Sequence, residues 1–180
     1  MGLALKQLTA DCNCDNKSNG VVAKLYYAPL CDFLAVGTID AAETDIDEYG
    51  VVDTAHTFTA PKGFIQIDFE DGENSIKMVK DGTKGYGNWK TSFEGLNPGY
   101  NRKMRGFVNQ QSKCKGIAIA ELTNGERIQI GSQDHPAYLK ADFDSTKTDD
   151  SNPFGFKLMI EASTPLIYEY KAGLAITLAS

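Results

Sequence analysis

The stretch from Asn97 to Ser132 constrains the fold most, because a helix signal, a strand signal and a hairpin signal follow one another almost without a gap. Asn97 can accept hydrogen bonds from the first free amides of a helix, and Pro98 suits the first turn, where a missing N–H costs nothing. Apolar side chains then recur on one helical face, and charged or amide side chains on the other. The inward face is expected to hold Tyr100, Met104, Phe107, Val108 and Gln111, and the outward face Arg102, Lys103, Arg105 and Asn109. The stretch therefore predicts one amphipathic helix over about 98–113.

A tight hairpin is predicted directly after this helix. Lys113, Lys115 and Gly116 suit the negative end of the helix dipole and a C-terminal cap. Two runs with alternating apolar residues, 117–122 and 127–130, then flank Thr123-Asn124-Gly125-Glu126. Asn-Gly is the commonest two-residue hairpin turn, because both central residues must take a positive φ.

The rest of the chain is predicted to form short strands joined by turns. Strands are expected at 21–28, 31–39, 64–70, 75–80, 88–94, 137–143, 154–162, 166–170 and 174–178, with a short extended piece in 51–58 and the second strand pairing with the first. Polar loops are expected at 40–53, 81–87 and 144–153. Roughly ten strands and one helix predict an all-β sandwich or barrel with one flanking helix.

One domain is expected in this chain of 180 residues, because its 42% hydrophobic and 23% charged residues are ordinary globular values and no break divides it. Residues 1–20 are polar and end at Gly20, so they are predicted to form an N-terminal arm outside the core. Such an arm could lie across a neighbour in an assembly. Residues 21–180 are expected to form the single β-rich domain.

The net charge of −6 and the isoelectric point near 4.9 argue against general affinity for a nucleic-acid backbone, which needs clustered Lys and Arg. They are compatible with a wall that DNA slides past, since an acidic surface repels phosphate. No apolar run approaches the roughly 20 residues of a membrane span. The start Met1–Lys6 lacks the basic region and long apolar core of a signal peptide, so the cytoplasm is the expected compartment, without a membrane partner.

The four cysteines are Cys12, Cys14, Cys31 and Cys114. Reduced thiols are expected in a chain without an export signal. The alternative is a tetrahedral zinc site built from all four, but one residue separates Cys12 from Cys14, where about two to four usually separate paired ligands. Both interpretations stay open.

No catalytic residue or cofactor site is expected. His56 lies in a Thr-rich stretch and His135 follows Asp134, and both are predicted to be surface or turn histidines. An Asp and a His adjacent in sequence do not compose a catalytic triad, and no nucleophile elbow is present. Gly82, Gly85 and Gly87 lack the spacing of phosphate or dinucleotide loops. The chain is therefore not expected to be an enzyme.

Two acidic groups resemble calcium ligands in composition but lack the twelve-residue register with its terminal Glu. They comprise Asp68, Glu70, Asp71 and Glu73, and Asp142, Asp144, Asp149 and Asp150. Solvated turns are the better prediction, and no metal is expected. The aromatics that could stack sugars or bases fit core and interface positions more simply: Tyr26, Tyr27, Trp89, Tyr100 and Tyr168.

The order of several segments matches the pattern of a known family. These are the strand 22–29, the run 87–93, the helix from Pro98, the strand and hairpin 116–132 and the alternating segment 156–162. This order, over about residues 20–170, resembles the tail tube and related virion proteins of tailed bacteriophages. It is a resemblance of pattern, because that family has no catalytic signature.

The resemblance implies a β-barrel or sandwich with one flanking helix that assembles into hexameric rings. The rings would stack into a hollow tube of the virion tail, with edge strands paired between subunits. The implied partners are further copies of the chain, other tail proteins and DNA that passes through the lumen without specific binding. The loops 40–53, 81–87 and 144–153 would become ordered at ring-to-ring contacts.

A non-polymerising binding module is the alternative. A capsid decoration protein, a head-fibre protein or a carbohydrate-binding sandwich would be a stable monomer or trimer. It would gather exposed aromatics on one face.

Overall fold

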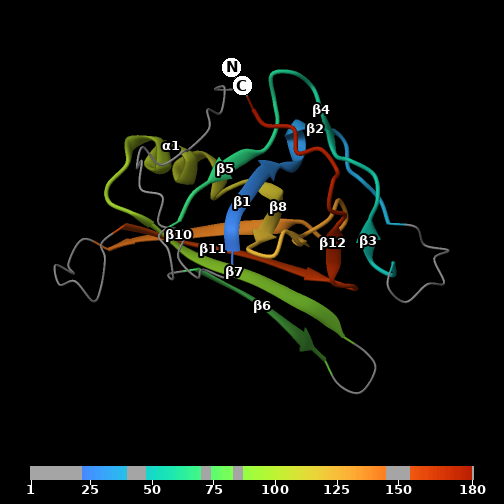
Figure 1. Cartoon of the computed structure of the whole chain (residues 1–180). Helices are drawn as coiled ribbons and strands as arrows, with labels where there is room; N and C mark the ends of the chain where they lie inside the picture. The colour runs from blue at the N-terminus through green and yellow to red at the C-terminus, as the bar shows by residue number, and fades with distance from the viewer. Residues whose placement is uncertain (1–21, 40–47, 70–73, 83–86, 145–154, 180) are drawn as a thin grey trace.

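The computed structural model describes residues 22–39, 48–69, 74–82, 87–144 and 155–179 (Figure 1). The predicted arm 1–20 lies outside these residues, as does most of each of the predicted loops. The described residues form twelve strands, one α-helix and one short 3-10 helix. They are β1 (Val22–Pro29), η1 (Leu30–Asp32), β2 (Phe33–Ala35), β3 (Val51–Val52), β4 (Thr57–Phe58), β5 (Ile65–Ile67), β6 (Asn74–Asp81), β7 (Asn88–Pro98), α1 (Arg102–Gln111), β8 (Lys115–Leu122), β9 (Arg127–Ile130), β10 (Ala137–Asp144), β11 (Gly155–Thr164) and β12 (Tyr168–Tyr170). The prediction of a β-rich fold with one flanking helix is confirmed.

Ten of the strands form one continuous sheet in the order β3-β12-β9-β8-β10-β11-β7-β6, with β1 paired to β8 and β5 paired to β1. β10 joins β8 only through Ala137 opposite Gly116 and Tyr138 opposite Lys115. The sheet therefore divides there into two layers, β6-β7-β11-β10 and β5-β1-β8-β9-β12-β3. Figure 1 shows the first layer running below β1 and β8.

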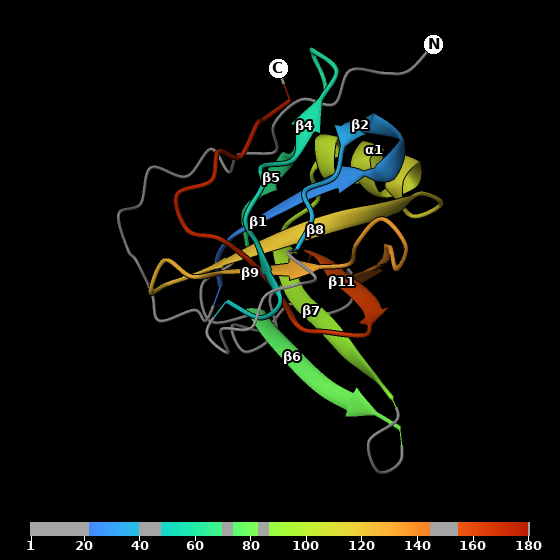
Figure 2. The ribbon, with the colours of Figure 1, turned by 90° about the vertical axis from the view of Figure 1, so that its right-hand side faces the viewer.

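The main core lies between these two layers and beneath α1. Its side chains come from both layers because alternate residues of each strand point inward. The largest fully buried ones include Tyr27, Leu25, Phe93, Met104 and Leu158. A second core covers the other face of β1, β8 and β12, where β2, β4 and the segment 174–178 pack against Phe64 and Tyr170. Figure 2 shows β2 and β4 beside β1.

The helix begins later than predicted. Asn101, rather than Asn97, is its N-cap, and the Asn101 side chain accepts a hydrogen bond from the Lys103 N–H at 2.8 Å. Asn97 belongs to β7, which continues to Pro98 because β11 pairs with it from Trp89 to Pro98. The buried Asn97 amide donates to the Asp68 carbonyl at 2.8 Å.

The predicted inward face of the helix is confirmed for Met104, Phe107 and Gln111, which are buried. Tyr100 is an exception, because it precedes the helix and is 53% exposed. The helix ends at Gln111, and the Ser112 N–H donates to the Val108 carbonyl at 2.9 Å.

The prediction that Gly116 caps the helix is wrong. Gly116 is a buried residue of β8 that lies opposite Pro29 of β1 and Ala137 of β10. Residues 112–114 form a turn that follows the helix, in which the Cys114 N–H donates to the Gln111 carbonyl at 2.9 Å.

The hairpin between β8 and β9 is confirmed, but the prediction that its loop has two residues is wrong. The Gly125 N–H donates to the Leu122 carbonyl at 3.0 Å, so the turn spans Leu122–Gly125. The Leu122 N–H donates to the Glu126 carbonyl at 2.8 Å, and Gly125 has a φ of 91°. This is the three-residue hairpin loop in which one glycine takes the left-handed conformation.

Two predicted strands differ in the structure. The segment 31–39 does not pair with β1; its strand β2 pairs with β4, while β1 is occupied by β5 and β8. The segment 174–178 is not a strand, although Leu178 forms one parallel bridge with Phe64. The predicted strands at 137–143 and 154–162 are confirmed as β10 and β11.

Candidate functional site

One exposed feature is the outer face of the four-stranded layer β6-β7-β11-β10. Phe93, Ile160 and Leu139 occupy paired positions on its inner face and are buried. The alternate residues therefore point outward. Their charged members whose side chains the structure describes are four lysines and four carboxylates: Lys77, Lys90, Lys140, Lys157, Asp81, Glu94, Asp142 and Glu161.

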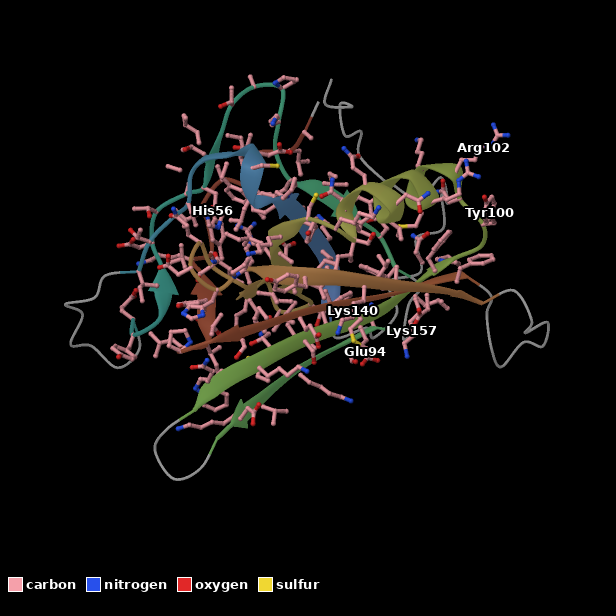
Figure 3. The ribbon with its side chains drawn as sticks, turned by 180° about the vertical axis from the view of Figure 1, so that it is seen from behind. His56, Glu94, Tyr100, Arg102, Lys140 and Lys157 are labelled. Carbon is pink, nitrogen blue, oxygen red and sulfur yellow. The ribbon has the colours of Figure 1, made fainter. Side chains whose placement is uncertain are left out.

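Five of these charged residues form cross-strand ion pairs. Lys157 of β11 lies 3.4 Å from Glu94 of β7, and Lys90 of β7 lies 3.0 Å from Glu161 of β11. Lys140 of β10 also bonds to Glu161. Figure 3 shows Glu94, Lys140 and Lys157 close together on this layer. Three of the four lysines, Lys90, Lys140 and Lys157, are thus held beside carboxylates.

Glu161 connects three of the four strands electrostatically. Hydrogen bonds from Lys140 and Lys90 lower the pKa of its carboxyl group below the ordinary value. A depressed carboxyl pKa stabilises the folded state above the unfolded pKa, and this contribution disappears as the pH falls through the folded value. Glu161 is therefore ionised at neutral pH.

Glu161→Gln should lower the free energy of unfolding by at most about 1 kcal/mol at pH 7, because exposed pairs of this kind are screened by solvent. The difference from wild type should shrink in high salt and vanish at a pH well below the ordinary carboxyl pKa. Urea unfolding at two salt concentrations measures both effects. Glu126→Gln in the exposed hairpin turn removes the same charge as a control, and an equal loss in both variants would contradict the role given to the two ion pairs.

The two outer edges of this layer are open within the described part of the chain. There, β6 pairs with β7 only, along all eight of its residues. β10 pairs with β8 only at Ala137 and Tyr138, so its second edge is open from Leu139 onward. Unpaired edges present rows of free N–H and C=O groups that can pair with another chain.

A cleft of about 380 Å³ lies at one end of the outer face. Its lining includes Lys90, Asp134, His135, Tyr138 and Glu161. The His135 N–H donates to Ser132 Oγ at 3.1 Å, which places His135 in a turn, as predicted. A smaller cleft of about 290 Å³ is lined by residues 36–39, Val52, Gln129, residues 132–134 and Tyr168.

His56 is buried, so the prediction of a surface or turn histidine is wrong for it. Its ring stacks on Tyr170 with 4.9 Å between centroids. The Gly37 N–H donates to Nδ1 at 2.9 Å, so Nε2 carries the proton and donates to Gln129 Oε1 at 3.0 Å. Burial lowers the pKa of His56 to about 4. A neutral, fully bonded histidine inside the second core is a structural residue.

Two of the four cysteines of the alternative zinc site lie among the described residues. Cys31 is exposed, Cys114 is half-buried and both are free, whereas Cys12 and Cys14 lie outside the described residues. Within the described ranges, no three His, Cys, Asp or Glu side chains are grouped so that they could hold a metal ion.

Of the two acidic groups, only some members lie among the described residues. Asp142 and Asp144 lie in strand β10 rather than in a turn, while Glu70, Asp71, Glu73, Asp149 and Asp150 lie outside the described ranges. Of the aromatic side chains, Tyr26, Tyr27 and Tyr168 are buried, as expected for core positions. Trp89 is half-buried on β7.

Comparison with known proteins gives no family for this chain. No family model, curated protein or solved structure matches it. None of the helices among the described residues is long and apolar enough to span a membrane.

Proposed function

We propose that this chain is a structural subunit of a bacteriophage tail tube, which assembles into stacked hexameric rings around a DNA-conducting channel. The observation that carries the proposal is the four-stranded layer, whose two outer edges, β6 on one side and β10 on the other, have no strand partner among the described residues. In a ring, β6 of one subunit would pair with β10 of the next. This pairing would remove both exposed edges, as closure of a barrel does.

The outer face of the same layer suits a channel wall. Three of its four lysines, Lys90, Lys140 and Lys157, lie beside carboxylates in cross-strand pairs, so their charge is neutralised locally. Nucleic-acid affinity grows with the number of phosphates that free cations neutralise. A wall without surplus positive charge would let DNA pass without retaining it. Other tail proteins would bind the ends of the tube.

Negative-stain electron microscopy of the concentrated protein, with light scattering alongside, tests the proposal. We expect rings or tubes with a central channel, and ring masses near six times the 19.6 kDa of one chain. Hydrogen exchange should show that amides of β6 and of β10 beyond Leu139 become protected on assembly. The hairpin turn 123–126 serves as the control segment. Rings with unprotected β6 and β10 edges would contradict the pairing.

A stable monomer or trimer at every concentration would favour the alternative, a capsid decoration or head-fibre protein. One observation supports it. Tyr100 and Phe143 are exposed, and their rings meet edge to face with 5.6 Å between centroids. Exposed aromatic pairs occur at binding surfaces of many kinds.

A further inference from the structure

The first surface that carries a further inference is the helix flank, defined by Tyr100, Arg102, Lys103, Arg105 and Phe143. Tyr100 is 53% and Phe143 is 41% exposed, and the two rings are in contact. The Arg105 guanidinium donates to the Tyr100 hydroxyl at 2.8 Å and lies against its ring. No acidic residue occurs between residues 99 and 115. Within residues 99–115 the helix flank is an exposed aromatic pair with basic and no acidic neighbours. Asp142 precedes Phe143 in β10, and its side chain points to the opposite face of the layer because successive strand residues alternate.

The second surface is the strand flank, defined by Glu48, Tyr49, Asp53, Ile167 and Glu169. Tyr49 is 58% and Ile167 is 37% exposed. Gly50, which follows Tyr49 in the chain, lies against Ile167, since a Cβ placed on Gly50 would lie 2.7 Å from the Ile167 carbonyl oxygen. Glu48, Asp53 and Glu169 are exposed around them, and Lys171 pairs with Glu48 at 3.2 Å. The strand flank is an exposed apolar pair in a mainly acidic surround.

The two flanks lie at opposite ends of the molecule. Strand β11 connects them, because Phe156 near its start contacts Phe143 and Tyr100, and Thr164 at its end precedes Ile167 by three residues. Eight residue steps of a strand span about 25 Å. Figure 1 shows α1 on one side and β3 on the other, and Figure 3 shows Tyr100 and Arg102 on the side of α1. The helix flank and the strand flank of one chain therefore cannot contact each other.

We propose that the helix flank of one subunit docks on the strand flank of the next copy of this chain. Aromatic residues and Arg at the centre of a patch are typical of protein interfaces, and opposite charges favour this contact. A two-fold dimer through either flank would set like charges against each other. A head-to-tail contact is therefore expected, which generates rings or filaments. This inference rests on the proposed function and names a second contact between its subunits, besides the pairing of β6 with β10.

Two charge-reversal variants test the contact. The helix-flank variant carries Arg102→Glu and Lys103→Glu, substitutions suited to the N-terminal turn of α1 because acidic side chains favour that end of a helix. The strand-flank variant carries Asp53→Lys and Glu169→Lys at exposed positions. Each substitution changes the charge by two, so both variants keep a net negative charge and have no general attraction for each other. Circular dichroism checks that both are folded.

Each variant alone should need at least about ten times the wild-type concentration to assemble, as measured by light scattering, because it sets like charges together. An equimolar mixture should assemble as the wild type does, since the helix flank of each variant then meets an opposite charge. A single chain with all four substitutions should recover in the same way. This recovery is specific to a contact between the two flanks.

The possible failures are distinguishable. Variants that assemble like the wild type would overturn the flank contact while leaving rings closed by β6 and β10 intact. A mixture that does not recover would also overturn it. Recovery into filaments without a channel would support the contact and contradict the tail-tube proposal. A wild type that stays monomeric at low salt and high concentration would overturn the flank contact.

Discussion

Gly116→Ala should lower the free energy of unfolding by about 3 kcal/mol, the upper range for volume added to a packed core. A Cβ at this position would lie 2.5 Å from the Tyr27 ring and 2.7 Å from the Ala28 carbonyl oxygen. Tyr27 cannot move away freely, because it is fully buried and its hydroxyl donates to the Cys114 carbonyl at 3.2 Å. Either the ring or the β1–β8 pairing must shift. Urea unfolding followed by circular dichroism measures the loss.

Gly106→Ala is the matched control. Gly106 lies on the exposed face of α1, and a Cβ there would meet nothing within 4 Å. This change should raise the free energy of unfolding by about 0.5–1 kcal/mol, because alanine favours the helix over glycine. Equal effects at the two glycines would show that Gly116 is not closely packed.

The pattern of alternating apolar residues predicted most strands correctly, since one face of each is buried. Phe156, Leu158 and Ile160 are buried in β11, as their spacing indicated. The pairing of β1 was missed because the partners of a strand depend on the whole sheet, and β8 and β5 follow far along the chain. The same non-local pairing explains why Asn97 and Gly116 lie in strands and do not cap the helix. Each suits a helix end locally, but β11 and β1 extend a sheet over them.

The outer charged face was only partly visible in the sequence. Lysine and glutamate alternate with apolar residues in β7 and β11, which predicts a wet face. The ion pairs depend on register, because Lys157 reaches Glu94 only when Leu158 lies opposite Gly95. His56 gave no local signal, since its ring partner Tyr170 and its acceptor Gln129 lie more than 70 residues away in sequence.

His56 should make the protein sensitive to acid. Its two ring nitrogens are satisfied only in the neutral form, because Nδ1 accepts from the Gly37 N–H and Nε2 donates to Gln129. The Gln129 amide group donates to the Gly131 carbonyl at 2.9 Å, which keeps its oxygen turned toward His56. A second proton on the ring would face the Gly37 N–H, which is itself a donor. Protonation is therefore coupled to disruption of the second core.

Wild-type protein should lose about 3 kcal/mol of unfolding free energy between pH 6.5 and pH 4 through this residue alone. The sign follows from the pKa of about 4 in the folded state, below the ordinary 6.5, because the unfolded chain binds the extra proton first as the pH falls. Urea unfolding across this range should give a steeper pH dependence for wild type than for His56→Gln. A histidine NMR titration of the wild type gives the pKa of His56 directly, even where the variant folds poorly. A value near 6.5, with parallel slopes for the two proteins, would contradict the buried neutral ring.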